Sequence, residues 1–234
     1  GVRPSKLSTK ALLAGKTRRQ AERELEREFF VTPERAKLCV DASEHTVEAM
    51  NLLAPRDLSV YIGIPFCPTR CAYCSFVGES VERFGEFLPP YLDCLLREVE
   101  YTGKLLRQSG WHVRTLYMGG GTPTTLSAEQ MARLLDAVNT HFDLSRCLEF
   151  TVEGGRPDTL DAEKLRVIKA GGATRISINP QTMSDTVLKA VGRRHSAASV
   201  VDVFHQAREA GFDDINMDLI AGLPADTADG FAES

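Results

Sequence analysis

Three of the six cysteines in this chain fall within a stretch of eight residues. Cys67, Cys71 and Cys74 follow the spacing C-x-x-x-C-x-x-C, and three thiolates on one short loop can wrap around a single metal cluster. A structural zinc ion needs a fourth ligand, usually from a second Cys or His pair, and the chain has no such pair. The spacing favours a 4Fe–4S cube with one iron open to a bound molecule. The alternatives are a zinc site whose fourth ligand comes from a distant part of the chain, or a chance cluster of buried cysteines.

The open iron of such a cube needs a chelating ligand, and the amino and carboxylate groups of S-adenosylmethionine (SAM) provide one. With Tyr73 as the aromatic residue before the third cysteine, the loop resembles the signature of the radical SAM superfamily. The resemblance implies that the reduced cluster passes an electron to the sulfonium of SAM. SAM then splits into methionine and a 5′-deoxyadenosyl radical, which abstracts a hydrogen atom from the substrate.

Two further motifs follow predicted strands. The run Gly119–Pro123 is by itself a flexible turn, but glycines also let the backbone approach a ligand closely. Glu153 ends the next strand, where a carboxylate can accept hydrogen bonds from ribose hydroxyls or an ammonium group. The resemblance implies that Gly120 and Gly121 bind the amino group of SAM through backbone carbonyls and that Glu153 contacts SAM. It also assigns Tyr61 and Tyr73 to the cofactor site.

Three more stretches each have an ordinary structural explanation when taken alone: turn residues in Asn179–Met183, a charged helix end in Gly192–His195 and an Asp at a strand end in Asn216–Pro224. In this order after the cysteine loop they resemble the oxygen-independent coproporphyrinogen III oxidase family, which includes related haem chaperones. The resemblance extends from Leu58 to Pro224 and implies that Gln181, Arg193 and Asp218 lie around SAM or a second SAM molecule. The motifs Asn-Pro-Gln and Glu-Gly-Gly-Arg-Pro-Asp favour the branch called coproporphyrinogen dehydrogenases.

The function implied by the resemblance is that of an oxidoreductase of haem biosynthesis, which decarboxylates coproporphyrinogen III oxidatively to protoporphyrinogen IX. It implies a porphyrinogen substrate and an electron donor such as flavodoxin or ferredoxin. Two positions depart from the best-studied oxidases: Phe76 replaces a further cysteine and Gly63 replaces a histidine. A haem-binding chaperone without decarboxylase activity, or a radical SAM enzyme acting on another substrate, therefore stays open.

Short β-rich segments alternate with longer helical ones after residue 57, which predicts a parallel sheet with crossover helices. We expect an α/β fold, a partial (β/α) parallel barrel of the radical SAM type truncated after about five strands. The chain would then be a fragment, incomplete at its C-terminus. The expected strands are Leu58–Ile64, Thr115–Met118, Leu148–Val152, Arg175–Ile178 and Ile215–Ile220, and the expected helices are 90–109, 128–142, 161–170 and 197–211.

Residues 1–56 predict a small helical segment that precedes the radical SAM core at 57–234. Gly15 ends a first helix, Thr17 caps a second helix that runs to about Phe29, and Thr32 with Pro33 opens a third.

Composition excludes several classes of function. The net charge of −4 provides no global basic field for nucleic acid, and no stretch approaches the roughly 20 apolar residues of a membrane span. The clustered cysteines do not resemble a secreted disulfide framework, which favours the reducing cytoplasm.

The candidate site residues come from the ends of different strands. Because the carboxyl ends of parallel strands lie at one edge of a sheet, we expect the cysteine loop, Gly119–Gly121, Glu153, Gln181 and Asp218 to line one cavity. Arg193 follows a helix rather than a strand, so its position is less constrained by this argument.

The cysteine pattern makes a direct prediction about metal content. Reconstituted protein is expected to carry about four iron and about four sulfide per chain, as one cube requires. Replacing Cys67, Cys71 or Cys74 by Ala should remove most of both, whereas the same change at Cys39, Cys94 or Cys147 should not. Iron and sulfide analysis checks this, and a requirement for the scattered cysteines would contradict the three-ligand assignment.

Overall fold

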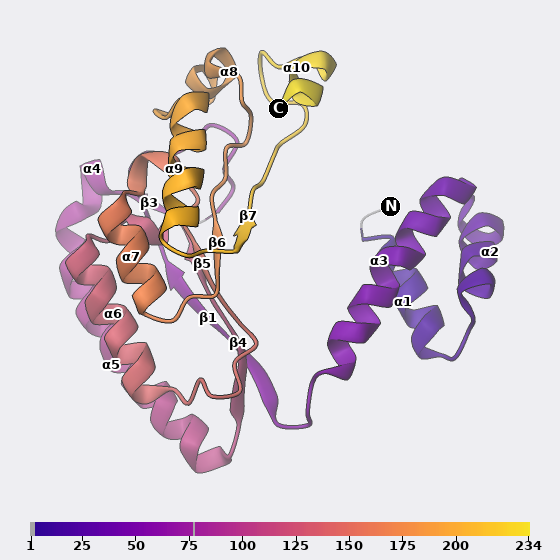
Figure 1. Cartoon of the computed structure of the whole chain (residues 1–234), viewed down its shortest axis with the longest axis horizontal. Coiled ribbons are helices and arrows are strands. Elements are labelled where there is room, and N and C mark those ends of the chain that lie inside the picture. The colour runs from indigo at the N-terminus through magenta and orange to yellow at the C-terminus, as the bar shows by residue number, and fades with distance from the viewer. Residues whose placement is uncertain (1–2, 77) are drawn as a thin grey trace. The chain divides into compact units, whose positions relative to one another are not determined.

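The computed structural model describes residues 3–76 and 78–234, and the chain divides into two units, Gly1–Pro55 and Arg56–Ser234 (Figure 1). The elements described in the first unit are helices, and the second unit contains the sheet.

Three helices form the first unit: α1 (Ser5–Leu13), α2 (Arg18–Phe29) and α3 (Pro33–Asn51). Thr17 caps α2 as expected, since its side chain accepts from Gln20 N while the Gln20 side chain accepts from Thr17 N. Thr32 occupies the corresponding position before α3, but its side chain makes no capping hydrogen bond. The core of this unit consists of small and aliphatic side chains: Ala11, Ala21, Leu25, Ala36 and Val40.

A five-stranded parallel sheet organises the second unit, in the order β1-β4-β5-β6-β7. The expected α/β fold with a parallel sheet is confirmed. Among the described strands, β1 and β7 each have one neighbour, so this sheet is open. The strands are β1 (Asp57–Ile64), β4 (His112–Gly120), β5 (Glu149–Glu153), β6 (Arg175–Ser177) and β7 (Asp214–Asn216).

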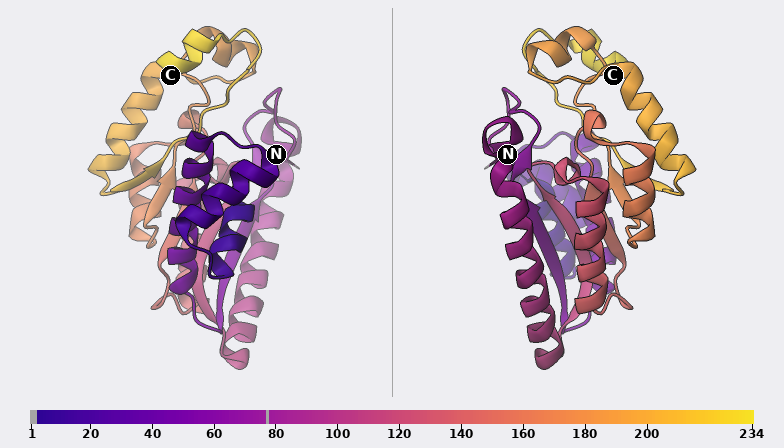
Figure 2. Two further views of the ribbon diagram at one scale, coloured as in Figure 1. Left: turned by 90° about the vertical axis from the view of Figure 1, so that its right-hand side faces the viewer. Right: turned by 90° about the vertical axis from the view of Figure 1, so that its left-hand side faces the viewer.

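Four crossover helices lie along one face of the sheet, and Figure 2 shows them from two further sides. They are α5 (Leu88–Ser109), α6 (Ala128–His141), α7 (Ala162–Ala170) and α9 (Ala197–Glu209). Fully buried side chains such as Leu116 of β4, Leu134 of α6 and Leu165 of α7 fill the space between helices and sheet. Burial of each stabilises the fold by about 1.5–3 kcal/mol.

The fifth expected strand is shorter than the sequence predicts, because β7 ends at Asn216 rather than Ile220. The facing segment contains Pro180, which has no N–H to donate to the ladder. The Asp218 carbonyl accepts instead from Gln181 N at 2.9 Å, and Asp218 N donates to the side-chain Oδ1 of Asn179 at 3.3 Å rather than to a strand carbonyl. Pairing resumes only as an isolated bridge between Gln181 and Leu219.

The structure also contains several short elements, and the sequence does not predict the two shortest strands. Two-residue strands β2 (Phe66–Cys67) and β3 (Glu79–Ser80) pair in parallel on either side of the cysteine loop. The helix expected before Arg193 is α8 (Asp185–Ala190). The other short helices are α4 (Val81–Phe84), α10 (Ala228–Glu233) and the 3-10 turns η1 (Gly85–Phe87), η2 (Pro123–Thr125) and η3 (Pro157–Thr159). They carry too few residues for a helical period to be recognised.

The two threonines that precede α2 and α3 form a matched pair for a stability test. Thr17→Ala removes a reciprocal capping pair and should lower the free energy of unfolding of the first unit by about 1 kcal/mol. Thr32→Ala removes no capping bond and should leave that free energy nearly unchanged. Hydrogen exchange of the α2 and α3 amides measures both, and equal effects of the two changes would contradict the capping assignment.

Candidate functional site

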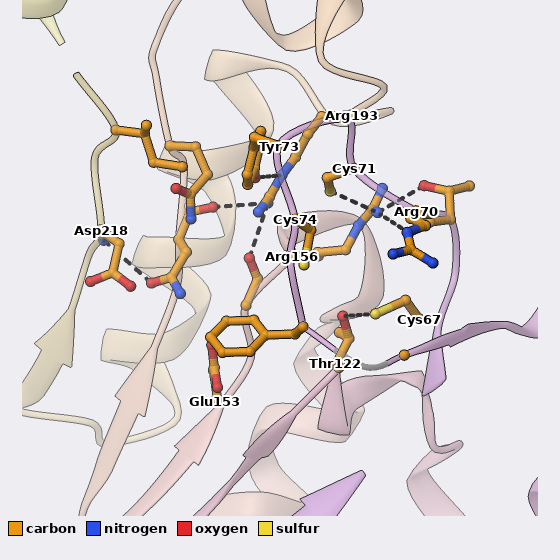
Figure 3. A pocket seen from close by; sticks show the side chains of 18 of the residues that line it. Cys67, Arg70, Cys71, Tyr73, Cys74, Thr122, Glu153, Arg156, Arg193 and Asp218 are labelled. Atoms are coloured by element: carbon orange, nitrogen blue, oxygen red, sulfur yellow. Dashed lines mark hydrogen bonds between the residues drawn. The ribbon is translucent and has the colours of Figure 1, made fainter. Parts of the chain in front are cut away.

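A cavity of about 530 Å³ opens at the carboxyl ends of the strands (Figure 3). The expected convergence is confirmed for most of the candidate residues. The lining includes the three clustered cysteines together with Tyr73, Gly120, Gly121, Glu153, Gln181, Arg193 and Asp218. Gly119 and Tyr61 are not among the lining residues.

The cysteine loop is held at both of its ends. β2 carries Cys67 and pairs with β3, while the N of Ala72 donates to the carbonyl of Val191 at 3.1 Å. Thr122 Oγ1 lies 3.5 Å from Cys67 Sγ, to which it donates, and burial raises the pKa of the Cys67 thiol. All three clustered cysteines are half-buried and unbridged.

The three thiols are not arranged to hold a single ion. In the described part of the chain, no three His, Cys, Asp or Glu side chains form a group that could hold one metal ion. The geometry therefore gives no support to the alternative of a zinc site. A cube differs from a single ion because each thiolate binds a different iron, so its ligands need not converge on one point.

The backbone of Gly121 lies directly against the cysteine loop. A Cβ at this position would lie 2.7 Å from the carbonyl oxygen of Phe66 and 3.0 Å from Cys67 Sγ. Gly120 adopts a φ of +108°, a conformation that L side chains rarely adopt. The glycine run therefore allows two segments to approach beside the first cysteine, which a side chain would prevent.

Glu153 points into the cavity from the end of β5 (Figure 3). Burial raises the pKa of its carboxyl, and the nearby negative charge of Asp218 raises that pKa further. The hydroxyl of Tyr117 donates to Glu153 Oε2 at 3.4 Å, and burial raises the pKa of Tyr117 to about 12. Tyr61 stacks on Tyr117 with ring centroids 5.8 Å apart, and its side chain is 63% exposed.

Arg193 joins three segments of the site, although its place in the sequence suggested this least. Its Nε donates to the Tyr73 hydroxyl at 3.0 Å, and its Nη1 donates to the carbonyls of Gly155 and Asn179, each at 3.0 Å. Arg193 is buried, and burial raises the pKa of Tyr73 to about 12. One guanidinium thus fixes the cysteine loop to the ends of β5 and β6.

The segments after β6 and β7 place Gln181 and Asp218 side by side. Gln181 N donates to the carbonyl of Asp218 at 2.9 Å, and the Asn216 side chain donates to Asp218 Oδ1 at 2.9 Å. Gln181 has a φ of +70°, which costs a non-glycine residue about 1–2 kcal/mol. The surrounding hydrogen bonds hold this strained backbone at the cavity wall.

Comparison with known proteins identifies the family. The model of the "Radical SAM superfamily" matches residues 61–234. The chain belongs to the radical SAM superfamily. Its cofactors, as a member, are a 4Fe–4S cluster and SAM. The cavity fits both, since it places three half-buried thiols beside a glycine backbone and two carboxylates.

Relatives within the radical SAM superfamily carry two kinds of name. One relative is the oxygen-independent coproporphyrinogen-III oxidase-like protein HemZ of Bacillus subtilis. The two sequences are 39% identical in an alignment that covers 100% of this chain and 47% of the relative. It is 40% identical, over 72% of this chain and 44% of the relative, to the heme chaperone HemW of the same organism. The chain spans less than half the length of these curated relatives.

The solved structure of coproporphyrinogen III oxidase (HemN) from Escherichia coli, described as a radical SAM enzyme, shares the fold. It matches with a TM-score of 0.69 and 31% identity, covering 81% of this chain and 43% of that one.

None of the described helices is long and apolar enough to span a membrane.

Sequence reasoning missed several residues of this radical SAM site. Arg156, Asn179 and His195 are all more than nine-tenths buried around it. Burial and the neighbouring Arg193 charge lower the pKa of His195 to about 4, so its imidazole is neutral at physiological pH. Arg156 belongs to the motif Glu-Gly-Gly-Arg-Pro-Asp, in which the sequence assigns a role only to Glu153.

Glu153 offers a test that combines stability and pH. Because the folded-state pKa of Glu153 lies above its ordinary value, ionisation costs stability, and this cost appears as pH rises through the raised pKa. Glu153→Gln should therefore make the ligand-free protein more stable at pH 7 and equally stable at a pH well below about 4. Thermal unfolding across pH measures this, with exposed Glu98→Gln as the control. A destabilised E153Q protein at pH 7 would contradict it.

Proposed function

We propose that this chain forms the core of a radical SAM oxidoreductase that converts coproporphyrinogen III to protoporphyrinogen IX by oxidative decarboxylation. The observation that carries the proposal is the single cavity that joins the three thiols to Glu153, Arg193 and Asp218. The names of the relatives supply the substrate class, since HemZ and HemN relatives are called coproporphyrinogen oxidases or oxidase-like.

In this proposal Cys67, Cys71 and Cys74 hold the 4Fe–4S cluster, which when bound and reduced supplies the electron that cleaves SAM. The backbone carbonyls of Gly120 and Gly121 accept hydrogen bonds from the amino group of SAM. An external carrier, such as flavodoxin or ferredoxin, provides the electron.

The two carboxylates of the cavity suit a cationic ligand. The charge of Asp218 raises the pKa of Glu153, which means that the two groups repel each other in the ligand-free protein. SAM carries positive charge on its sulfonium and ammonium groups, so its binding relieves this repulsion. Glu153 and Asp218 then accept hydrogen bonds from the ammonium or the ribose hydroxyls, and Gln181 and Tyr73 complete the pocket wall.

The mouth of the cavity presents surface that suits a tetrapyrrole. Met217 and Leu219 are each 41% exposed there and Phe76 is 70% exposed, which provides apolar surface for the macrocycle. Arg70 also lines the cavity with an exposed side chain and can pair with a propionate. Tyr61, outside this lining, supports the site by stacking on Tyr117, which donates to Glu153.

Haem binding without decarboxylation is the second candidate function. Two observations favour it: the 40% identity to a heme chaperone, and Phe76 in place of a cysteine of the best-studied oxidases. Both candidates share the cluster and the SAM pocket, so only the substrate reaction separates them.

An anaerobic assay of the protein that carries this chain distinguishes the two functions. With SAM, a strong reductant and coproporphyrinogen III, we expect 5′-deoxyadenosine and protoporphyrinogen IX, quantified by chromatography after oxidation. Cys71→Ala should reduce both products to background, whereas Cys94→Ala, which alters an exposed cysteine, should not.

Each other outcome has a defined meaning. Haem binding and SAM cleavage without decarboxylation would favour the chaperone function. Intact SAM after prolonged reduction of the cluster-loaded protein would contradict the radical SAM chemistry itself.

A further inference from the structure

The buried Arg156 lies beside one of the clustered thiols and is not explained by binding of SAM or substrate. We propose that Arg156 is a positioning residue that holds Cys71 and raises the reduction potential of the cluster. The inference rests on the proposed function, because it requires that Cys71 binds the cluster.

Arg156 makes its contacts to the cysteine loop through a single nitrogen. Nη1 lies 3.8 Å from Cys71 Sγ, 3.1 Å from the carbonyl oxygen of Thr69 and 2.8 Å from Thr69 Oγ1, and its two N–H groups are shared among these three acceptors (Figure 3). Thr69 lies two residues before Cys71, so the guanidinium fixes both the backbone and the sulfur of this part of the loop. Arg156 is only 2% exposed.

The remaining donors of Arg156 are occupied by a carboxylate from its own loop. Nε and Nη2 donate to the two oxygens of Asp158, each at 3.1 Å. This fork fixes the plane of the guanidinium and directs Nη1 at the cysteine loop. Because the ion pair is bidentate, a lysine at position 156 could keep the charge but not this orientation.

The buried side chain of His195 lies next to the Arg156–Asp158 ion pair but adds no positive charge to it. His195 Nδ1 lies 3.8 Å from Asp158 Oδ1, and its side chain is fully buried. Since its pKa is lowered to about 4, His195 is neutral at pH 7 and adds no charge to those of Arg156 and Asp158.

The direction of the effect on the cluster follows from electrostatics. Reduction adds one electron, so the reduced cluster and its thiolates carry one more negative charge than the oxidised form. A hydrogen bond from a buried cation to a ligating sulfur stabilises the more negative form, because low local polarity strengthens the interaction. Hydrogen bonds to the sulfurs are among the factors that set cluster potentials. Arg156 therefore makes the cluster easier to reduce.

The other two arginines of the cavity differ from Arg156 in contact or in exposure. Arg193 donates to the Tyr73 hydroxyl and to two backbone carbonyls. Arg70 belongs to the cysteine loop itself but is exposed, so water screens its charge. Arg70→Gln is therefore a matched control that removes one positive charge from the same cavity.

Potentiometric titration of the reconstituted protein, followed by electron paramagnetic resonance of the reduced cluster, tests the proposal without substrate. Arg156→Gln should shift the midpoint potential to a more negative value while iron content stays at the wild-type level. Arg156→Lys should recover part of the shift, because it keeps the charge without the fork. Arg70→Gln should titrate near the wild-type value.

A change of opposite sign provides the second test. Asp158→Asn removes the negative partner of Arg156 and should shift the potential to a more positive value. If Arg156→Gln does not retain its cluster, the reduction potential of Asp158→Asn tests the proposal instead. An unchanged potential in cluster-loaded Arg156→Gln, or no positive shift in Asp158→Asn, would overturn the inference and leave the proposed function intact. Wild-type protein that binds no cluster would instead overturn both.

Discussion

The parallel alignment of β1, β4, β5, β6 and β7 is the constraint on which the rest of the site depends. Parallel strands end at the same edge of the sheet, so residues that are far apart in the sequence open on one cavity. The crossover helices and the aliphatic core between helices and sheet keep these ends in register. The short β2–β3 pair then anchors the cysteine loop above the end of β1.

Two buried guanidinium groups connect the loops that the sheet brings together. Arg193 links Tyr73 of the cysteine loop to the carbonyls of Gly155 and Asn179, and Arg156 links Thr69 and Cys71 to Asp158. Buried charges are costly unless they are fully hydrogen-bonded. Their retention here is consistent with a site in which loop positions must be fixed to within a fraction of an ångström.

The ligand-free site contains features that are unfavourable for a closed core. Burial and Asp218 both disfavour the ionised form of Glu153, and Gln181 adopts a left-handed backbone conformation. Such features concentrate at functional sites, where a ligand compensates them. A cationic cofactor between Glu153 and Asp218 would do so, which is why the electrostatics of the cavity support SAM binding.

Local sequence patterns identify the helices and strands of this chain and the residues whose chemistry is visible in a short motif. Cysteine spacing, the Gly119–Gly121 run, Glu153 at a strand end and the alternation of strand and helix patterns were sufficient to predict the sheet and to place the cysteine loop, the glycine run and Glu153 at its carboxyl edge. The hydrogen-bond partners of Arg156 and Arg193, the burial of His195 and the early end of β7 opposite Pro180 follow from tertiary contacts instead. These depend on which carbonyl, thiol or carboxylate lies across a loop contact, up to 120 residues away in the case of Arg193 and Tyr73. Local periodicity carries no information about such partners, because they are chosen by packing between segments that are distant in the chain.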